Sequence, residues 1–249
     1  MNAPRCFVEK NFTKDQMLEC AHDGTKFPYS QDEIREGLIK GGFGHRFVDL
    51  PEKYGDAKGE RLTDPFFSRG LGLFIHGGVG RGKTTLCALL AKEYYLRHPA
   101  FLEVVGVGKD LAQLVCPPIL RFATPSMVSM GVREATDGLR QPWGGEGGNK
   151  HRQTPVGFLR EYSKCRVLFL DELGRDLLPG FELRNLQAVI YARYDEGLQT
   201  VYASNYSLEE LAGAGQLGGH VVSRIQETCR IIHMNGPDYR EPAIKINQA

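Results

Sequence analysis

From about Gly70 onward the chain repeats one pattern of hydrophobic and polar positions. A short apolar run is followed by a glycine-containing turn, and the turn by a segment whose apolar residues recur every three or four positions. The runs that predict strands are LGLFIHG at 71–77, VLFL at 167–170 and TVYAS at 200–204, and CRIIHMNGPDYR at 229–240 predicts a strand followed by a turn. Strand, turn and helix in repeated order is typical of a parallel sheet covered by helices. We therefore predict an α/β domain over about 46–249.

Amphipathic helices are expected between these strands. The two clearest apolar stripes are Leu86, Leu89, Leu90 and Tyr94, and Leu183, Leu186 and Ile190. Thr124 followed by Pro125 is typical of a helix start. Ser207 and Glu210 match a capping box, and Gly197 is a helix stop. These signals predict helices that begin after 124 and 207 and one that ends near 197.

Three segments depart from this pattern. Residues 1–45 carry mixed charge, contain a modest helical pattern over Gln31–Lys40 and end in the glycine-rich GGFGHRF, so we interpret them as a small N-terminal appendage and linker. Residues 101–120 form an apolar insertion that ends in prolines, and residues 141–154 form a glycine-rich one. The pattern assigns neither insertion a role.

The composition excludes several classes of protein. Hydrophobic residues make up 41% and charged residues 24% of 249, which is enough to build a core. No apolar run approaches the about 18 residues of a membrane span, and the first residues lack the apolar stretch of a secretion signal, so we expect a cytoplasmic protein. The six cysteines include no CxxC pair, and Cys20 with His22 is not a sufficient ligand set, so we expect neither a disulfide framework nor a zinc site.

The segment GGVGRGKT carries the clearest chemistry. It matches the pattern G-x-x-x-x-G-K-[ST] between an apolar strand and a helix, where backbone N–H groups turn inward around a phosphate. Lys83 is expected to meet the β and γ phosphates of ATP, and Thr84 to hold Mg²⁺. The residues expected around the nucleotide are Gly77, Gly78, Val79, Gly80, Arg81, Gly82, Lys83, Thr84 and Thr85.

Polar residues also end two of the predicted strands. VLFL is followed by Asp171 and Glu172, and buried strands rarely end in adjacent carboxylates without a cation nearby. We expect Asp171 in the Mg²⁺ shell and Glu172 to line up a water on the γ-phosphate. Ser204 and Asn205 end the next strand, and the Asn205 amide could orient that same water; the alternative is a turn residue before the Ser207 cap.

The net charge of +1 gives no general attraction to nucleic acid, so any DNA contact must come from a local patch. Six basic residues lie between Arg140 and Arg166 against two acidic ones, an excess of four positive charges. Arg140, Lys150 and Arg152 are the candidate DNA contacts. The alternative is a solvated loop.

The order of these motifs resembles the DnaC/DnaI helicase-loader family of AAA+ ATPases and its IstB transposition relatives. The P-loop, LFLDELG, IYARYDEGLQTVYASNYSLEEL, VSRI and GPDYR follow one another between Gly77 and Arg240. The resemblance implies an AAA+ P-loop domain, with a RecA-like parallel sheet and no full C-terminal lid. It also implies that Asn205 is the first sensor, Arg224 an arginine finger for the neighbouring subunit's ATP, and Arg240 the second sensor.

The resemblance further implies an ATP-dependent loader that delivers a ring helicase to single-stranded DNA. Its residues 1–45 would bind the helicase, and its subunits would associate into a ring or spiral. An IstB-like helper that binds duplex DNA and a transposase is the alternative, although HDGTKFPYS and GGFGHRF are unlike the long E-x-x-x-R helix with which such chains usually start. A nucleotide or small-molecule kinase would share the P-loop but needs an acceptor pocket and lid arginines.

Overall fold

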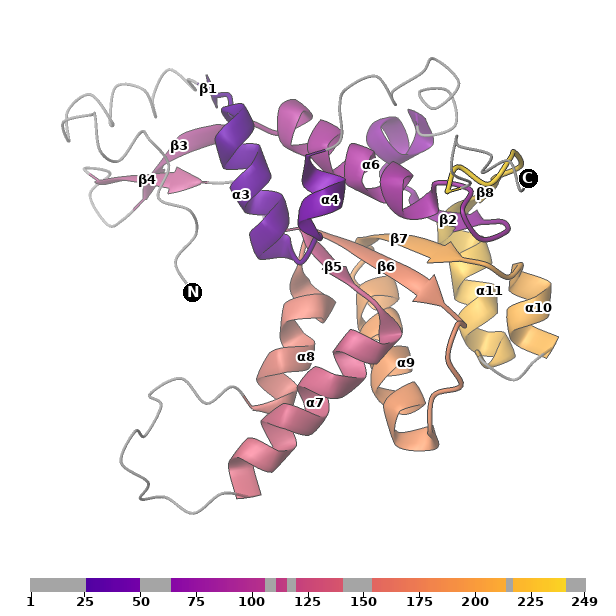
Figure 1. The fold of residues 1–249 in the computed structure, drawn as a ribbon. Helices are drawn as coiled ribbons and strands as arrows, with labels where there is room; N and C mark the ends of the chain where they lie inside the picture. Colours follow the sequence, from indigo (N-terminus) through magenta and orange to yellow (C-terminus); the bar gives the residue numbers. More distant parts are fainter. Residues whose placement is uncertain are drawn as a thin grey trace, which may run out of the picture.

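The computed structural model describes residues 26–49, 64–105, 111–115, 120–140, 154–213 and 217–240. A parallel sheet lies between two layers of helices, with a small antiparallel sheet beside it (Figure 1). The strands are β1 Lys26–Phe27, β2 Gly72–His76, β3 Ala100–Val105, β4 Leu111–Val115, β5 Arg121–Ala123, β6 Val167–Leu173, β7 Gln199–Ser204 and β8 Cys229–His233. The helices include α3 Gln31–Gly41, α4 His45–Val48, α6 Lys83–Arg97, α7 Pro125–Arg140, α8 Pro155–Lys164, α9 Gly180–Asp195, α10 Leu208–Gly213 and α11 Gly219–Thr228.

The larger sheet has the strand order β5-β6-β7-β2-β8, and all four of its pairings are parallel. The first of its strands in the chain, β2, lies between β7 and β8, which come last. The chain therefore leaves β2 for the far edge at β5, returns strand by strand to β7, and crosses to β8. Such a switch in strand order opens a crevice at the carboxyl ends of the strands, where ligands bind in open α/β sheets.

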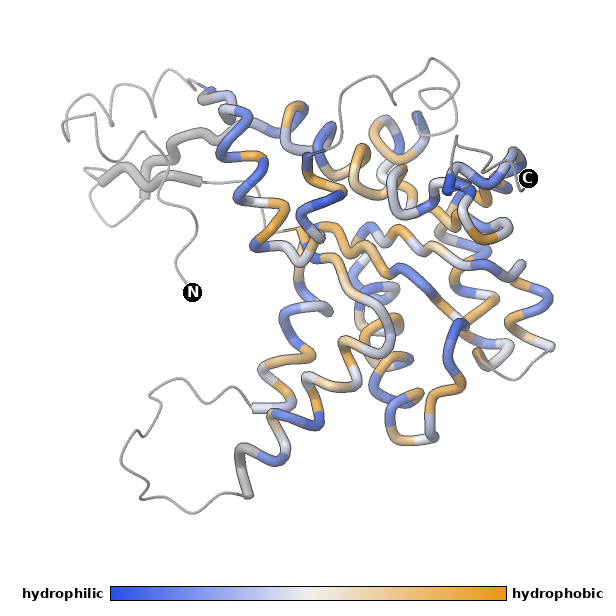
Figure 2. The backbone as a smooth tube through the Cα atoms, in the orientation of Figure 1, coloured by the Kyte–Doolittle hydropathy of each residue, from blue (hydrophilic) through white to orange (hydrophobic). Residues whose placement is uncertain are grey.

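Alternate residues of the strands supply two separate hydrophobic layers. Leu73 and Ile75 of β2 pack with α3, α4 and α6, whereas Phe74 between them packs with α7, α9, α10 and α11. Figure 2 shows the resulting orange, hydrophobic strands inside more mixed helices. The strands β2, β6 and β7 are buried on both faces for this reason, as a helix-covered parallel sheet requires, whereas the edge strand β8 exposes Arg230, Ile231 and His233.

The predicted helices and caps are confirmed. In α6, Leu90 and Tyr94 of the predicted stripe are buried, whereas Leu86 and Leu89 are only partly buried. Cys87, Ala88 and Ala91 lie on the buried face instead. The Thr124 hydroxyl accepts a hydrogen bond from the Met127 N–H at 3.2 Å. The Ser207 and Glu210 side chains each accept a hydrogen bond from the other's N–H, and Gly197 takes a φ of +62° after α9. None of the described helices has the length and hydrophobicity that crossing a membrane requires.

The segments outside the repeated pattern have a definite structure where they are described. Ile34, Leu38 and Phe43 lie in the same hydrophobic cluster as Leu73, so this part of 1–45 packs directly on the larger sheet and α6. Within the insertion at 101–120, β3 and β4 form an antiparallel hairpin, and β3 also pairs with β1. Residues 1–25 (with Cys20 and His22) and 141–153 lie outside the described residues.

A buried arginine of α9 ties the amino end of β7 to the end of α8. Arg193 of α9 is 1% exposed. Its guanidinium donates to the carbonyls of Tyr162 and Cys165 at the end of α8, at 2.9 and 2.7 Å, and to the Gln199 carbonyl where β7 begins. Its Nε donates to the Thr200 hydroxyl at 2.9 Å. Among the described residues no carboxylate hydrogen-bonds to this guanidinium, so backbone carbonyls solvate the charge.

We predict that Arg193→Ala lowers the free energy of unfolding by about 2–4 kcal/mol, because several buried carbonyls lose their donor at once. Lysine should restore little of this, since one ammonium cannot follow the geometry of the planar guanidinium. Urea unfolding followed by circular dichroism measures the change. Arg184→Ala, an exposed arginine of the same helix, is the control. Equal stability of the two alanine variants would contradict this role.

Candidate nucleotide site

The predicted phosphate-binding loop connects the carboxyl end of β2 to the start of α6. Gly77, Gly80 and Gly82 have φ values of +147°, +75° and +84°, which glycine adopts without strain. The Lys83 ammonium folds back over the loop and donates to the carbonyls of Gly77 and Gly78, each at 2.8 Å. The loop therefore surrounds a positive charge in its own hollow.

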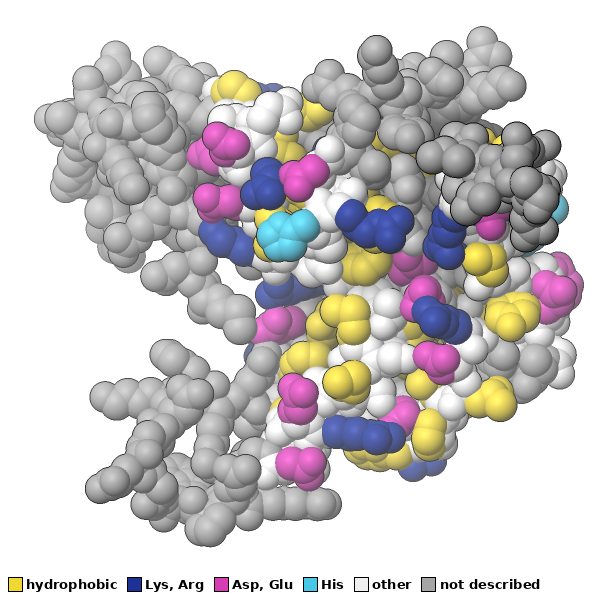
Figure 3. Space-filling model, in the orientation of Figure 1, with side chains coloured by type: hydrophobic (Ala, Val, Ile, Leu, Met, Phe, Trp, Pro, Cys, Tyr) yellow, Lys and Arg dark blue, Asp and Glu magenta, His cyan; other side chains and the backbone are white. Residues whose placement is uncertain are grey.

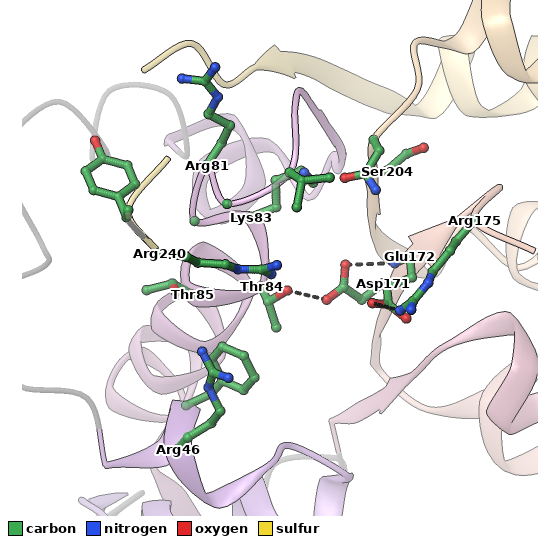
Figure 4. A pocket seen from close by; sticks show the side chains of 16 residues that line it. Arg46, Arg81, Lys83, Thr84, Thr85, Asp171, Glu172, Arg175, Ser204 and Arg240 are labelled. Carbon is green, nitrogen blue, oxygen red and sulfur yellow. Dashed lines mark hydrogen bonds and ion pairs between the residues drawn. The ribbon is translucent and has the colours of Figure 1, made fainter. Parts of the chain in front are cut away.

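A cavity of about 410 Å³ lies over this loop. It draws its walls from the P-loop, from the ends of β6 and β7, from the segment after β8 and from α4 (Figure 4). The lining residues are Arg46, Phe47, Val79, Gly80, Arg81, Gly82, Lys83, Thr84, Thr85, Asp171, Glu172, Arg175, Ser204, Asn205, Tyr239 and Arg240. Most of the predicted site residues thus come together in one place.

Thr84 and Asp171 join the P-loop helix to β6. The Thr84 hydroxyl donates to Asp171 Oδ2 at 2.5 Å, and the Glu172 N–H donates to Asp171 Oδ1 at 2.8 Å. Burial raises the pKa of Asp171, and the hydrogen bond from Thr84 acts in the opposite direction. Burial also lowers the pKa of Lys83, which Asp171 partly offsets. A hydroxyl and a carboxylate side by side are hard oxygen ligands of the kind that fit Mg²⁺.

Glu172 has an unusual backbone. Its φ of +57° is the only positive value at a non-glycine position among the described residues. The register of β6 with β7 is irregular between Leu170 and Leu173, so β6 runs on through the two acidic residues instead of stopping before them. The Glu172 carboxylate accepts from Arg175 Nη1 at 2.5 Å. Such strain persists at functional sites when neighbouring contacts hold it.

The segment after β8 folds back over the P-loop. The Met234 N–H donates to the His76 carbonyl at 2.7 Å, and the Tyr239 N–H donates to the Gly80 carbonyl at 3.0 Å. A side chain at Gly80 would overlap the Asp238 carboxylate, so the close approach needs glycine there. This contact brings Arg240, more than 150 residues later in the chain, to the cavity wall.

Asn205 also lines the cavity, just beyond β7. The Ser204 hydroxyl donates to the Leu173 carbonyl at 2.6 Å and accepts from the Tyr206 N–H at 3.0 Å. These two bonds connect the carboxyl ends of β6 and β7 and hold the turn that presents Asn205. Asn205 therefore lies beside the strand that carries Asp171 and Glu172, as its place in the sequence predicts.

Arg224 does not line the cavity of its own chain. It lies on α11, where its guanidinium stacks over the rings of Tyr191 and Tyr194 on α9, with its carbon 4.6 and 5.0 Å from their centroids. Its Nη1 donates to the His220 carbonyl at 3.4 Å. A role for Arg224 in hydrolysis therefore requires a second subunit.

The candidate DNA contacts are only partly described. Lys150 and Arg152 lie outside the described residues, and Arg140 is the last residue of α7. Within the same basic region, Lys164 forms an ion pair with Glu196, and Arg166 is a hydrogen-bond partner of Tyr94. On the face shown in Figure 3, basic side chains lie beside acidic ones. Part of the predicted positive excess is therefore compensated.

The cavity also contains residues that the sequence reasoning missed: Arg46 and Phe47 of α4, Arg175 in the turn after β6, and Tyr239. Tyr239 belongs to the GPDYR motif, in which only Arg240 was singled out, and the other three belong to no motif. Arg46 and Phe47 stand in the GGFGHRF segment, which the glycine pattern identified only as a linker. Arg175 follows Glu172 at a turn spacing, which is the one local signal that could have suggested it.

No protein-family model and no curated protein matches this chain. Among solved structures, it is similar to a proposed primosome component from Streptococcus pyogenes serotype M3, with 17% identity and a TM-score of 0.52 over 80% of this chain and 93% of the other. It is also similar to AMPPCP-bound DnaA from Aquifex aeolicus, with 18% identity and a TM-score of 0.51 over 75% of this chain. The chain shares the α/β fold of these two proteins, a helix-covered parallel sheet with the P-loop between β2 and α6. It spans about half of that DnaA, 51% of its length.

Solved structures similar to the chain also include the DnaC helicase loader, at 22% identity and a TM-score of 0.48 over 70% of this chain and 86% of the other. The parallel order of the sheet explains why the carboxyl ends of β2, β6 and β7 all meet the same cavity. The fold expected from the motif order is confirmed.

Proposed function

We propose that this protein is an ATPase switch that binds ATP with Mg²⁺ in the cavity above β2. The observation that carries the proposal is the convergence of Lys83, Thr84, Asp171, Glu172 and Asn205 on one cavity from three strand ends. Phosphate, metal and water are the three partners that such a set of side chains suits.

Each residue has a role that follows from its chemistry. Lys83 leaves the carbonyls of Gly77 and Gly78 and donates to the β and γ phosphates. Thr84 and Asp171 hold Mg²⁺, which when bound neutralises phosphate charge. Glu172 and Asn205 orient the attacking water, with Glu172 as its base. These steps place the chemistry at the carboxyl edge of the sheet.

Two further groups act at the edges of the cavity. Arg240, carried by the segment after β8, responds to the γ-phosphate as the second sensor. Phe47 and Tyr239 are aromatic lining residues available to the base and sugar. Because the segment that carries Arg240 is held to the P-loop by the Tyr239 N–H on the Gly80 carbonyl, nucleotide binding is coupled to that C-terminal segment.

We predict that Lys83→Ala weakens ATP binding by about 100-fold or more, because the loop loses its charge-assisted contact to the phosphates. Isothermal titration calorimetry with a non-hydrolysable ATP analogue and Mg²⁺ measures it. Lys40→Ala, which removes an exposed helix ion pair with Glu36, is the control and should leave binding unchanged. Wild-type affinity in Lys83→Ala would refute the assignment of the P-loop.

We further infer that the switch loads a replicative ring helicase onto single-stranded DNA, with residues 1–45 binding the helicase. The order of the motifs between Gly77 and Arg240 supports this, and so does the similarity in fold to a proposed primosome component. The alternative is an IstB-like helper of transposition that binds duplex DNA and a transposase. A kinase would require a phosphate acceptor in the same cavity.

Which kind of DNA stimulates ATP hydrolysis distinguishes the helicase loader from the transposition helper. We predict that single-stranded DNA raises the steady-state ATPase rate and that Lys150→Ala with Arg152→Ala weakens DNA binding. Each lost phosphate contact should reduce the salt slope by about 0.7. Fluorescence anisotropy of labelled oligonucleotides at several salt concentrations measures the slope, with Arg97→Ala as an exposed-arginine control. Stimulation by duplex alone would favour the transposition helper, and phosphorylation of a small acceptor the kinase.

We also propose that Arg224 completes the site of a neighbouring subunit in a ring or spiral. Its absence from its own cavity supports a role in trans. Arginine fingers contribute about 10³ to 10⁵ in rate, because a guanidinium stabilises charge that develops on the γ-phosphate. To reach the ATP of a neighbouring subunit, the Arg224 guanidinium must either leave the rings of Tyr191 and Tyr194 or contact that ATP while it stays stacked on them.

We predict that Arg224→Ala binds ATP normally but hydrolyses it at least about 10³-fold more slowly. Mixing it with Lys83→Ala should restore some hydrolysis, because one variant retains a working cavity and the other an intact finger. A phosphate-release assay over a range of protein concentrations measures both effects. An inactive mixture, together with a wild-type rate per subunit that does not change on dilution, would assign Arg224 to packing within its own subunit.

A further inference from the structure

The ion pair between Glu172 and Arg175 lies inside the proposed catalytic cavity, and both residues line it (Figure 4). They are joined twice. Arg175 Nη1 lies 2.5 Å from Glu172 Oε1, and the Arg175 N–H donates to the Glu172 carbonyl at 3.1 Å. Gly174, with a φ of +81°, lets the chain close this turn. The turn therefore presents the guanidinium to the carboxylate that the proposed function needs for water.

The pair also coincides with the strained point of the backbone. Glu172 takes its φ of +57° while its N–H is held by Asp171 Oδ1 and its carbonyl by the Arg175 N–H. Contacts on both sides are what keep a non-glycine residue in the left-handed region. The side chain of Arg175 adds a third contact, to the carboxylate itself. In this arrangement one oxygen of that carboxylate is committed to the guanidinium.

The pair is weak enough to be exchanged. The side chains of Arg175 and Glu172 are 58% and 42% exposed, and an ion pair of this kind changes an equilibrium constant by only about fivefold or less. A phosphate group offers more negative charge and two oxygens that match the guanidinium fork. In the proposed function, the γ-phosphate of ATP is the group that would lie between Lys83 and β6. ADP leaves the ion pair without a competitor.

We propose that Arg175 is a nucleotide-responsive latch on Glu172. Without a γ-phosphate, Arg175 pairs with the Glu172 carboxylate and holds it away from water. When ATP is bound, the guanidinium moves to the γ-phosphate, and the carboxylate is released to orient the water. Arg175 is thus a positioning residue for Glu172 and a contact that distinguishes ATP from ADP. This inference rests on the proposed function, since it requires ATP in the cavity.

A double-mutant cycle on binding tests the latch without any hydrolysis. The proteins are the wild type, Arg175→Ala, Glu172→Gln and the double variant, titrated with ADP or with a non-hydrolysable ATP analogue, each with Mg²⁺. Arg175→Ala should weaken binding of the analogue by about tenfold, the loss of one charge-assisted contact, and change ADP affinity by less than about twofold. Glu172→Gln should tighten binding of the analogue by about threefold, because the phosphate no longer competes with a charged carboxylate.

The decisive observation is the coupling between the two changes. The gain from Glu172→Gln should disappear when residue 175 is alanine, because no guanidinium then remains to be released. Retained ADP affinity shows that each variant is folded. Arg97→Ala removes another exposed arginine, paired with Glu93 at the far end of α6, and should change neither affinity.

Two results would overturn the latch while leaving the proposed function intact. One is an equal loss of ADP and analogue affinity in Arg175→Ala, and the other is a set of strictly additive effects in the double variant. Failure of the wild type to bind either nucleotide would overturn the proposed function and the latch with it. Arg175→Lys adds a further test, since an ammonium cannot make the two-pronged contact and should behave nearly as alanine does.

Discussion

The fold depends on a sheet that is buried on both faces and whose strands all run in one direction. Helices cover both faces, so polar side chains have room only where the strands end. Because β2, β6 and β7 are neighbours and parallel, their carboxyl ends meet at one edge. The P-loop, the two acidic residues and Asn205 are brought together by this constraint, although they stand in three separate parts of the chain.

Polar contacts then tie the strands at both ends. At the carboxyl edge, the Thr84 hydroxyl on Asp171 connects α6 to β6, and Ser204 connects β7 to the Leu173 carbonyl. At the amino edge, Arg193 connects α8 and α9 to the beginning of β7. The position of the acidic residues relative to the P-loop is therefore set by hydrogen bonds as well as by hydrophobic packing. Such a frame can support a strained residue such as Glu172.

In the proposed function, the charged contacts around the cavity are exchanged when the nucleotide binds. Lys83 donates to carbonyls of its own loop, and Glu172 accepts from Arg175. Each of these interactions has a substitute in a bound nucleotide, where a phosphate oxygen replaces a carbonyl or a carboxylate. In the proposed function, binding would thus replace existing contacts one for one, which limits the cost of desolvating the charged groups.

The sequence alone determined what depends on local pattern. Side-chain periodicity predicts the strand runs that are buried on both faces. Hydrogen bonding within a turn and backbone freedom predict the Thr124 and Ser207 caps, the Gly197 stop and the P-loop with its neighbouring acids.

Contacts among distant or irregularly spaced groups were decided by the tertiary structure. It placed α3 on the sheet, paired the insertion as a hairpin with β1, brought Arg46 and Arg240 to the cavity, and stacked Arg224 on two tyrosines. It also turned Glu172 into a left-handed conformation against Arg175. These features depend on which surfaces come into contact when the helices pack on the sheet. The pattern of side chains along the sequence does not determine those contacts.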